Sequence, residues 1–174
     1  MNDMRIATTA ETQSMISYLR DHGVEAFWHF TDSSNLASIA RQGALYSWWH
    51  CQQNHITIPR AGGNETSHAL DCRYDLQDFV RLSFNRDHPM QHSRHLRNHR
   101  FMLLRISLNV LRERPVCFTD MNATKTGHHL GTGLNMLRRI DLAGAQRTGV
   151  RFVSRDMRPI FDPKNGIDET LAFI

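Results

Sequence analysis

Cysteine and lysine are scarce in this sequence of 174 residues, and each scarcity excludes something. The three cysteines, Cys51, Cys72 and Cys117, lie far apart without paired spacing, which argues against a disulfide framework and against a four-ligand zinc site. Lys125 and Lys164 are the only lysines, so 19 of the 21 basic residues are arginines. Guanidinium groups form bidentate hydrogen bonds with phosphates and stack on bases, so this bias toward arginine indicates nucleic acid or a phosphorylated cofactor as the partner. A solvated basic surface is the alternative.

Long apolar runs and nucleotide-binding signatures are also missing. No run of about 18 apolar residues occurs, and residues 1–5 lack the apolar segment of a secretory signal. We therefore expect a soluble cytoplasmic protein that makes no membrane contact. Neither a G-x-G-x-x-G nor a Walker sequence is present, so a dinucleotide would have to be held in another way. The length suits one domain over residues 1–174.

Hydrophobic patterns predict short strands interspersed with short helices. Because the strands do not alternate regularly with long helices, the pattern favours an α+β fold over a doubly wound sheet. The predicted helices cover 9–22, 32–43, 67–76 and 133–142. The predicted strands or extended segments cover 24–30, 44–49, 78–84, 101–106, 116–120 and 169–174, and loops fill 50–66 and 143–168.

The strand at 78–84 leads into a turn rich in arginine and histidine. Residues 79, 81 and 83 alternate with 80, 82 and 84, so we expect the two sets on opposite faces of a half-buried strand. Pro89 cannot donate to a sheet ladder, and it therefore carries Met90 and the following basic residues to a rim.

Three short segments occur in a telling order along the chain. The first is His29-Phe30-Thr31, which is followed by Asn35-Leu36 and Gly43. The second is Asp78-Phe79-Val80, which leads to Pro89-Met90. The third is Glu169-Thr170-Leu171 in the last predicted strand, and Phe118-Thr119-Asp120 lies between the second and the third. This order resembles the DarT family of DNA ADP-ribosyltransferase toxins. In that family an H-x-T strand end precedes an N-L helix, a D-Y-V strand leads to P-M, and a late E-x-L strand carries the catalytic glutamate. The resemblance covers roughly residues 26–174.

The resemblance implies a fold, a donor and an acceptor. The fold would be that of the ADP-ribosyltransferases (PARP-like), with a split, mostly antiparallel sheet and peripheral helices. NAD would be the donor, without a metal, and a base in single-stranded DNA the acceptor. The protein would act as the toxin of a toxin–antitoxin system, paired with a cognate antitoxin that carries a macrodomain-type ADP-ribosylglycohydrolase.

The resemblance also implies roles for individual residues. Glu169 would hold the ribose 2′-hydroxyl and take a proton from the attacking base. The family's catalytic arginine slot aligns best with His68, with Arg60 and Arg73 as neighbours that could serve instead. A histidine there would make activity depend on pH. The expected cofactor contacts are His29, Phe30, Thr31, Ser38, Tyr46, Arg60, Arg73, Phe84 and Met90. The chain departs from the family pattern by stopping at Ile174, soon after Glu169.

The remaining basic and aromatic residues suggest contacts with a nucleic acid strand. We expect Trp48 and Trp49 to stack on unpaired bases, and Arg86 and Arg94 to contact phosphates at a rim. His88, His92, His95 and His99 have helical spacing but lack a cysteine or a close acidic partner, which favours this rim over a metal site. Two alternatives stay open. The acceptor could be RNA or protein, or the chain could be a non-catalytic module that binds single-stranded nucleic acid.

Overall fold

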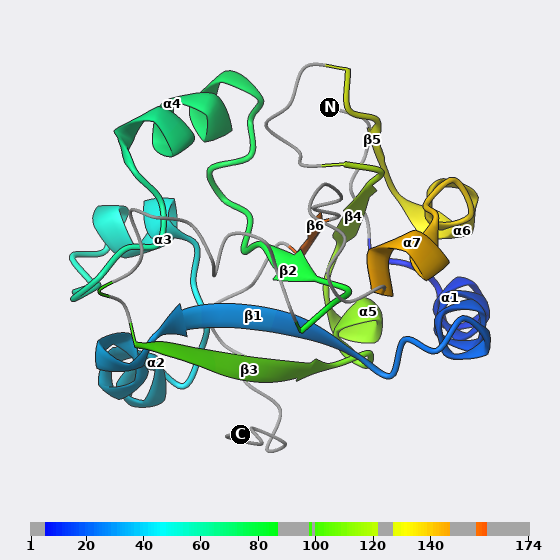
Figure 1. Cartoon of the computed structure of the whole chain (residues 1–174), viewed down its shortest axis with the longest axis horizontal. Coiled ribbons are helices and arrows are strands. Elements are labelled where there is room, and N and C mark those ends of the chain that lie inside the picture. Colours follow the sequence, from blue (N-terminus) through cyan, green and yellow to red (C-terminus); the bar gives the residue numbers. More distant parts are fainter. Residues whose placement is uncertain (1–5, 87–97, 99, 122–126, 147–155, 160–174) are drawn as a thin grey trace.

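The strands form one antiparallel sheet in the computed structural model, which describes residues 6–86, 98, 100–121, 127–146 and 156–159 (Figure 1). The six strands lie in the order β3-β1-β2-β6-β4-β5, and every pairing is antiparallel. The longest ladder joins β1 to β3, from the pair Ala26 and Ser107 to the pair Asp32 and Phe101. The strands are β1 (Ala26–Asp32), β2 (Leu82–Ser83), β3 (Phe101–Ser107), β4 (Val116–Thr119), β5 (Leu130–Gly131) and β6 (Asp156–Pro159).

Short helices gather at the two ends of this sheet. In Figure 1, α2, α3 and α4 lie on the left, whereas α1, α6 and α7 lie on the right. The helical segments are α1 (Thr9–Asp21), η1 (Ser33–Asn35), α2 (Leu36–Gln42), α3 (Trp48–Gln53), α4 (Glu65–Arg73), α5 (Val110–Glu113), α6 (Gly133–Leu137) and α7 (Leu142–Gln146). The expected α+β architecture with a mostly antiparallel sheet is therefore confirmed.

Helix α1 begins where its sequence predicts. Thr8 and Glu11 form a capping box, in which the Glu11 amide donates to the Thr8 hydroxyl at 3.3 Å and the Thr8 amide donates to the Glu11 carboxylate at 2.8 Å. Met15, Ile16 and Leu19 form its buried face. The predicted helix over 9–22 is confirmed to within one residue.

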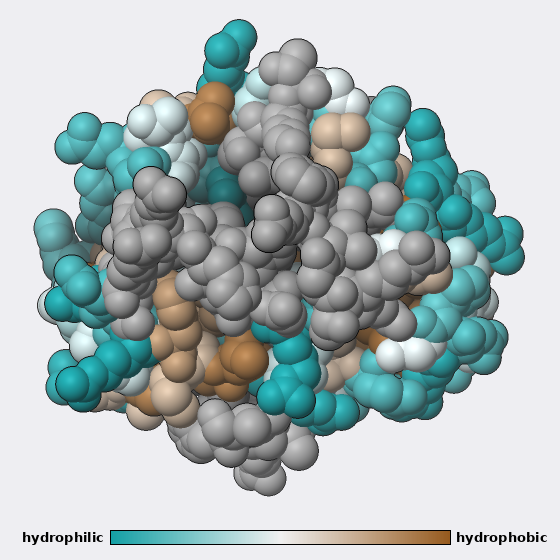
Figure 2. All heavy atoms as spheres, viewed as in Figure 1, coloured by the Kyte–Doolittle hydropathy of each residue, from teal (hydrophilic) through white to brown (hydrophobic). Residues whose placement is uncertain are grey.

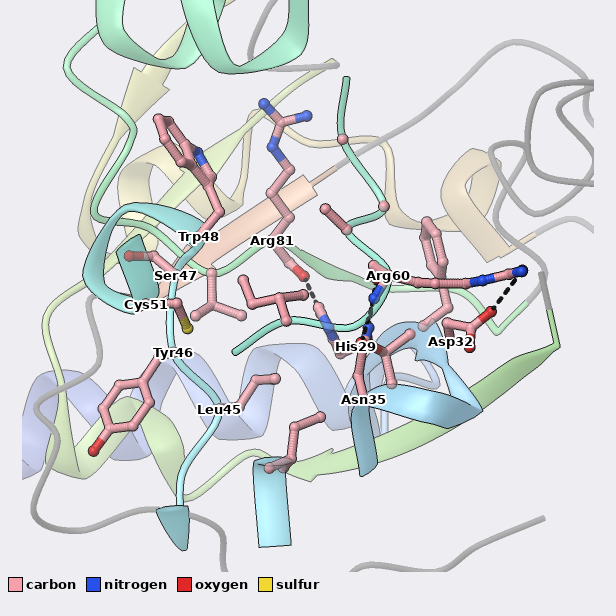
Figure 3. A pocket seen from close by; sticks show the side chains of 18 of the residues that line it. His29, Asp32, Asn35, Leu45, Tyr46, Ser47, Trp48, Cys51, Arg60 and Arg81 are labelled. Atoms are coloured by element: carbon pink, nitrogen blue, oxygen red, sulfur yellow. Dashed lines mark hydrogen bonds and ion pairs between the residues drawn. The ribbon is translucent and has the colours of Figure 1, made fainter. Parts of the chain in front are cut away.

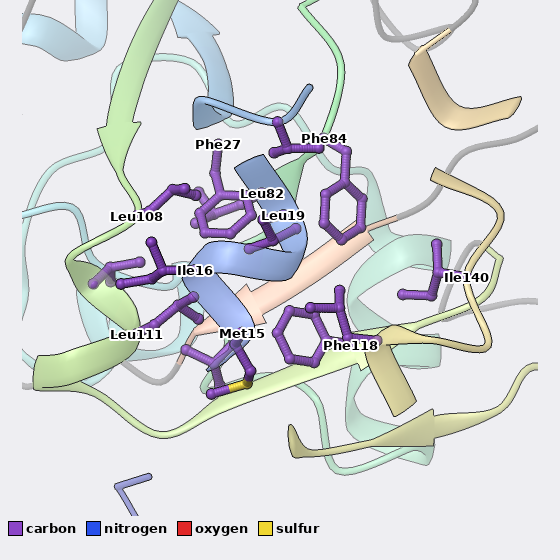
Figure 4. Packing of buried hydrophobic residues seen from close by; sticks show 14 of the residues in the cluster. Met15, Ile16, Leu19, Phe27, Leu82, Phe84, Leu108, Leu111, Phe118 and Ile140 are labelled. Atoms are coloured by element: carbon purple, nitrogen blue, oxygen red, sulfur yellow. The ribbon is translucent and has the colours of Figure 1, made fainter. Parts of the chain in front are cut away.

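The main core lies between α1 and the sheet (Figure 4). Phe27 of β1 and Phe118 of β4 are fully buried, as is Leu19 of α1. Phe84 packs edge-on against Phe27, with ring centroids 5.8 Å apart. Burying side chains of this size stabilises the fold by about 1.5–3 kcal/mol each. The core thereby fixes β1, the strand that carries the H-x-T segment. In the view of Figure 2, hydrophobic residues reach the surface in the lower half, near β1 and β3, whose own residues are buried or partly buried, and hydrophilic residues lie toward the sides.

The strand predicted at 78–84 is wrong in length and in being half-buried, whereas its alternation is confirmed, because Val80, Leu82 and Phe84 pack together in the main core and Phe79 packs elsewhere. Only Leu82 and Ser83 form β2, and Phe79 and Val80 are both buried. Phe79 packs with Leu76 in a second, smaller cluster that also holds Cys117. Because two cores meet at this segment, side chains are buried on both sides of the backbone, so the alternating faces are not divided into a buried and an exposed one.

The extended segment predicted at 44–49 is also wrong, because α3 begins within it. The Ser47 hydroxyl accepts from the His50 amide at 3.1 Å and so caps the helix that starts at Trp48. The next helix, α4, runs over Glu65–Arg73 instead of the predicted 67–76. Its start is set by Asn64, whose side-chain oxygen accepts from the Ser67 amide at 2.9 Å.

Two further predictions fail in the last third of the described chain. The helix predicted at 133–142 divides into α6 and α7, because the amides of Arg139 and Ile140 donate to Met136 and Leu137 at 3.1 Å in a tighter turn. The loop predicted at 143–168 contains β6, whose backbone pairs with β2 and β4. The strand predicted at 169–174 lies outside the described residues. In the part of the chain that the structure describes, no helix is long and apolar enough to span a membrane.

Candidate active site

A pocket opens beside β1, at the end of the sheet that carries α2, α3 and α4 (Figure 3). The outer half of β1 forms its floor, and residues 79–83 line it beside that strand. The segment 44–48, the loop 56–63 and helix α4 supply the remaining walls. Segments that are far apart in sequence therefore meet around one cavity.

His29 on β1 is held in one orientation at the pocket floor. Its Nδ1 atom lies 2.9 Å from the backbone carbonyl oxygen of Arg81. Because a carbonyl only accepts, Nδ1 carries the proton and donates. Burial lowers the pKa of His29, and the hydrogen bond to Arg81 only partly opposes this effect. The imidazole is therefore neutral at pH 7, and its Nε2 atom is an acceptor.

Asn35 connects β1 to the loop that carries Arg60. Its Nδ2 group donates to the Thr31 hydroxyl at 3.0 Å and to the Arg60 carbonyl at 2.7 Å. The Arg60 amide donates in return to Asn35 Oδ1 at 2.9 Å. The side-chain amide thus mimics a paired backbone unit, which fixes the loop against β1. Asn35 is buried, so these hydrogen bonds are shielded from water.

Asp32 is the last residue of β1, and its carboxylate contacts the turn that follows β1, the residue before β3 and the loop that carries Arg60. Its Oδ1 atom accepts from the Ser34 amide at 2.9 Å and from the Ser34 hydroxyl at 2.6 Å. Its Oδ2 atom accepts from the Arg100 amide at 3.1 Å and lies 3.9 Å from Arg60 Nη1. These hydrogen bonds, those from Ser34 above all, lower the pKa of Asp32 to about 2. The carboxylate is therefore charged at every physiological pH.

A charged and aromatic cluster forms the opposite wall. The buried Asp71 carboxylate of α4 accepts from Trp48 Nε1 at 3.2 Å and forms an ion pair with the Arg81 guanidinium. Figure 3 shows the Trp48 and Arg81 side chains extending from their backbones toward α4. The cluster connects α3, α4 and the segment that precedes β2, so it fixes the shape of this wall.

His68 belongs to the same wall. Its ring stacks on Trp48, with centroids 4.0 Å apart and planes inclined by 10°. Burial lowers the pKa of His68; the Asp71 carboxylate opposes this effect and the Arg81 guanidinium adds to it. His68 is therefore neutral at pH 7. Gly63 approaches it closely, because a Cβ atom at that position would lie 3.0 Å from His68 Nε2.

The pocket gathers residues from several of the predicted groups. Thr31 and Arg60 meet through Asn35, and Ser38 is tied to the loop by donating to the Thr57 carbonyl at 2.8 Å. Tyr46 lines the pocket, and its ring stacks on His50 at 4.3 Å. The predicted site residues that line the pocket are His29, Phe30, Thr31, Ser38, Tyr46, Trp48, Arg60 and His68.

Other predicted residues do not line the pocket, although Arg86 and Trp49 contact residues that do. Phe84 is a core residue that packs on Phe27, and Arg73 lies 5.9 Å over the Tyr74 ring. Arg86 lies 5.2 Å over the ring of Trp28. Trp49 contacts Trp48 edge-on at 5.5 Å. The predicted residues Glu169, Met90 and Arg94 lie outside the described residues, as do His88, His92, His95 and His99.

Sequence analysis missed Asp32, Asp71 and Arg81 as site residues. Asp71 follows His68 by one helical turn, which was the available signal for a shared face. The position of Arg81 depended on β2 being short, which its sequence did not indicate. Among the described residues, no group of three or more histidine, cysteine, aspartate or glutamate side chains is placed to hold a metal ion.

An antiparallel sheet with a pocket beside its H-x-T strand is the arrangement expected of an ADP-ribosyltransferase. The chain belongs to the DarT family: a family model described as "ssDNA thymidine ADP-ribosyltransferase, DarT" matches residues 28–151. The family transfers ADP-ribose from NAD to single-stranded DNA, as expected from the motifs. The matched range includes His29 and Asp78 but ends before Glu169.

Solved structures of Thermus sp. 2.9 DarT have the same fold. The complex with ADP-ribosylated ssDNA aligns with a TM-score of 0.63 at 16% identity, and the complex with NAD+ aligns with 0.59 at 17%. The complex with carba-NAD+ gives 0.59 at 16%. Each alignment covers 80% of this chain and 76% of the Thermus chain. No curated protein matches the sequence.

Proposed function

We propose that this protein binds NAD in the pocket beside β1 and transfers ADP-ribose to a thymine base of single-stranded DNA. The observation that carries the proposal is the convergence of the H-x-T strand, Asn35 and the Arg60 loop on one pocket that also contains Arg81. Membership of the DarT family supports both the donor and the acceptor.

The reaction exchanges one glycosidic bond for another. The bond between the nicotinamide nitrogen and the ribose anomeric carbon breaks, and nicotinamide leaves with the bonding electrons. Thymine N3, the ring nitrogen of thymidine that carries a proton, bonds to the same carbon and releases its proton. We assign the acceptance of this proton, and the hold on the ribose 2′-hydroxyl, to Glu169. Developing positive charge on the ribose requires a carboxylate nearby, and no metal is needed.

The pocket residues have roles that follow from their chemistry. His29 offers a neutral Nε2 acceptor, which suits a ribose hydroxyl or the nicotinamide amide. Phe30 packs edge-on against Phe101 at 5.7 Å and adds an apolar surface beside it. His68 is proposed to contact the reacting groups as a neutral imidazole. Thr31, Ser38, Tyr46 and Arg60 complete the proposed NAD site.

The proposed DNA path uses the aromatic and basic groups around the opening. The Trp48 ring stacks on His68 and meets the Trp49 ring edge-on. The Arg86 guanidinium lies over the Trp28 ring. Bases stack on such rings without sequence preference, so a strand would be held there while one thymine enters the pocket. Arg94 and Met90 are proposed to extend this path.

A partner follows from the product. ADP-ribose on thymine N3 would occupy the edge by which thymine pairs with adenine, so a hydrolase that removes the mark would protect a cell that carries this enzyme. We propose a cognate antitoxin with a macrodomain-type ADP-ribosylglycohydrolase in that role, and a cytoplasmic location where NAD and DNA are both present. The single domain over 1–174 remains a prediction.

Mass spectrometry of oligonucleotides tests the proposed function. The protein is incubated with NAD and single-stranded DNA, and with matched strands in which every thymidine is replaced. We expect an added ADP-ribose on thymidine-containing strands alone, and its loss in Glu169→Gln. Arg139→Gln, an exposed change on the far end of the molecule, is the control that should retain activity.

Three results would contradict the proposal. Equal modification of strands without thymidine would exclude the assigned base. Modification of RNA or protein in place of DNA would favour a different acceptor. Salt-dependent strand binding without NAD-dependent thermal stabilisation would favour a non-catalytic module, because a bound ligand raises the unfolding temperature.

A further inference from the structure

Arg81 connects the floor of the pocket to its charged wall. Its carbonyl accepts from His29 Nδ1 at 2.9 Å, whereas its guanidinium pairs with Asp71. One residue therefore sets the orientation of the imidazole through its backbone and holds a positive charge at a fixed place in the opposite wall through its side chain. Figure 3 shows the carbonyl directed toward His29 and the guanidinium directed away from it, toward α4.

Asp71 makes this positive charge rigid. Its side chain is 5% exposed, and its carboxylate also accepts a hydrogen bond from Trp48 Nε1. The ion pair engages Nη2 of Arg81, and a guanidinium has five N–H donors arranged in a plane. A guanidinium gripped at one end by a buried carboxylate can present its other edge to an anion without losing side-chain freedom on binding.

The other basic side chains in this region are less suited to an enclosed anion. His68 stacks on Trp48 and is neutral at pH 7. Arg73 lies over the Tyr74 ring and does not line the pocket. Arg60 lines it, but its side chain is 46% exposed and its Nη1 donates to the Asn98 carbonyl at 2.5 Å. The Arg81 side chain is 25% exposed and is the more enclosed of the two pocket arginines.

We propose that Arg81 binds the pyrophosphate of the dinucleotide and that Asp71 is its positioning residue. This inference rests on the proposed function, and it assigns the anion contact to a residue outside the predicted slot of His68, Arg60 and Arg73. The enclosed position favours a small ligand over a DNA phosphodiester, which would reach the more exposed Arg60 first. His29 and Arg81 line the same pocket, so the charge faces the cavity that holds the proposed NAD contact.

Binding of ADP-ribose, measured by calorimetry, tests the inference without turnover. ADP-ribose contains the pyrophosphate, whereas nicotinamide riboside contains no phosphate and serves as the matched ligand. We expect Arg81→Gln to weaken ADP-ribose about 10- to 100-fold, the usual effect of one charge-assisted hydrogen bond, and to leave nicotinamide riboside unchanged. Arg81→Lys should recover part of the loss, because a lysine restores the charge without the planar fork.

Kinetics separate the role of Arg81 from that of Asp71. Arg81→Gln should raise KM for NAD and leave KM for the oligonucleotide unchanged. Asp71→Asn keeps an acceptor for Trp48 but releases the guanidinium, so it should raise KM for NAD less than Arg81→Gln does, with kcat retained. The double variant Arg81→Gln/Asp71→Asn leaves no unpaired buried charge and should show the same loss of ADP-ribose affinity as Arg81→Gln.

The outcomes distinguish this inference from the proposed function. If the unmodified protein binds ADP-ribose and both Arg81→Gln and the double variant bind it equally well, the inference alone is overturned. A rise in KM for the oligonucleotide with unchanged KM for NAD would also overturn it and assign Arg81 to the DNA. If the unmodified protein binds neither NAD nor ADP-ribose, the proposed function and the inference both fail.

Discussion

His29 and Arg81 lie 52 positions apart and are joined by a hydrogen bond of 2.9 Å between imidazole Nδ1 and backbone carbonyl. Because the acceptor is backbone, no substitution of the Arg81 side chain removes it directly. The position of the backbone at Arg81 relative to β1 therefore fixes the tautomer of His29, with the proton on Nδ1. The same imidazole is neutral at pH 7, and this charge state matters for NAD binding.

NAD binding should weaken as pH falls through the pKa of His29 in the folded protein, which lies below the ordinary histidine value of 6.5. Burial lowers the pKa of His29, so the neutral form with an accepting Nε2 persists through pH 7, and protonation converts that atom into a donor. Unfolding exposes the imidazole and raises its pKa again, so stability is complete above 6.5 and declines as pH falls from there toward the folded value. Calorimetric titration of NAD from pH 8 to pH 5 measures the first effect.

His29→Gln supplies the matched comparison for this pH dependence. Glutamine cannot titrate, so the variant should bind NAD more weakly at pH 8 and lose the part of the pH dependence that His29 contributes. A variant with the same pH profile as the parent would show that another group titrates, and His68 is the first to test, because its pKa is also lowered.

Asp32 should protect the β1 end against acid until well below pH 4. Its pKa in the folded protein is about 2, against an ordinary value of 3.8, so its stabilising hydrogen bonds are complete above the ordinary value and are lost as pH falls toward 2. Asp32→Asn keeps one acceptor oxygen and removes the charge. We expect a lower unfolding temperature at pH 7 and a smaller difference from the parent at pH 2.5, measured by circular dichroism. An equal difference at both values would contradict this assignment.

Asn35→Ala should detach the Arg60 loop from β1. The change removes three hydrogen bonds of 2.7–3.0 Å and leaves the partly buried amide and carbonyl of Arg60 unpaired, which should cost about 1–3 kcal/mol of unfolding free energy. The Michaelis constant for NAD should rise as well. Urea unfolding measures the first effect. Asn54→Ala, which removes one exposed hydrogen bond of 2.9 Å to the His50 carbonyl, is the control and should change stability by less than about 0.5 kcal/mol.

Gly63→Ala and Gly62→Ala form a natural pair of variants. An added Cβ at Gly63 would lie 3.0 Å from His68 Nε2, whereas nothing lies within 4 Å of one at Gly62. We expect Gly63→Ala to displace His68 from Trp48, shift the tryptophan fluorescence and lower kcat/KM by about tenfold, since small misplacements near reacting groups are costly. Gly62→Ala should change neither value. Equal effects from both variants would show that loop flexibility, not contact with His68, is responsible.

The sequence predicted those parts of the fold that depend on local signals. Thr8 and Glu11 fixed the start of α1, and Gly43, with a left-handed φ of 63°, ended α2 as expected. The short helix α3 was missed, because Trp48 and Trp49 favour strands and only the cap at Ser47 decides otherwise. Strand β6 was missed because its four residues are paired on both edges by strands distant in sequence.

The site residues that belong to a sequence motif could be predicted, whereas those that are brought to the pocket only by tertiary packing could not. The H-x-T segment indicated His29 and Thr31, both of which line the pocket. Asp71 and Arg81 meet only because α4 folds back over the segment before β2, and no local pattern encodes that contact. Tertiary pairing of this kind has to be observed, since a sequence of short elements leaves many arrangements open.

The position of β6 bears on the order in which a newly made chain matures. The β1–β3 ladder can form once residue 107 has left the ribosome, but β2 and β4 are bridged in the sheet by residues 156–159. Translation therefore has to pass residue 159 before the sheet closes around its middle. The pairing of β1 with β3, which forms the floor of the pocket, therefore precedes the finished sheet during synthesis. The delay is the time needed to elongate about fifty residues, which is a few seconds at ordinary translation rates.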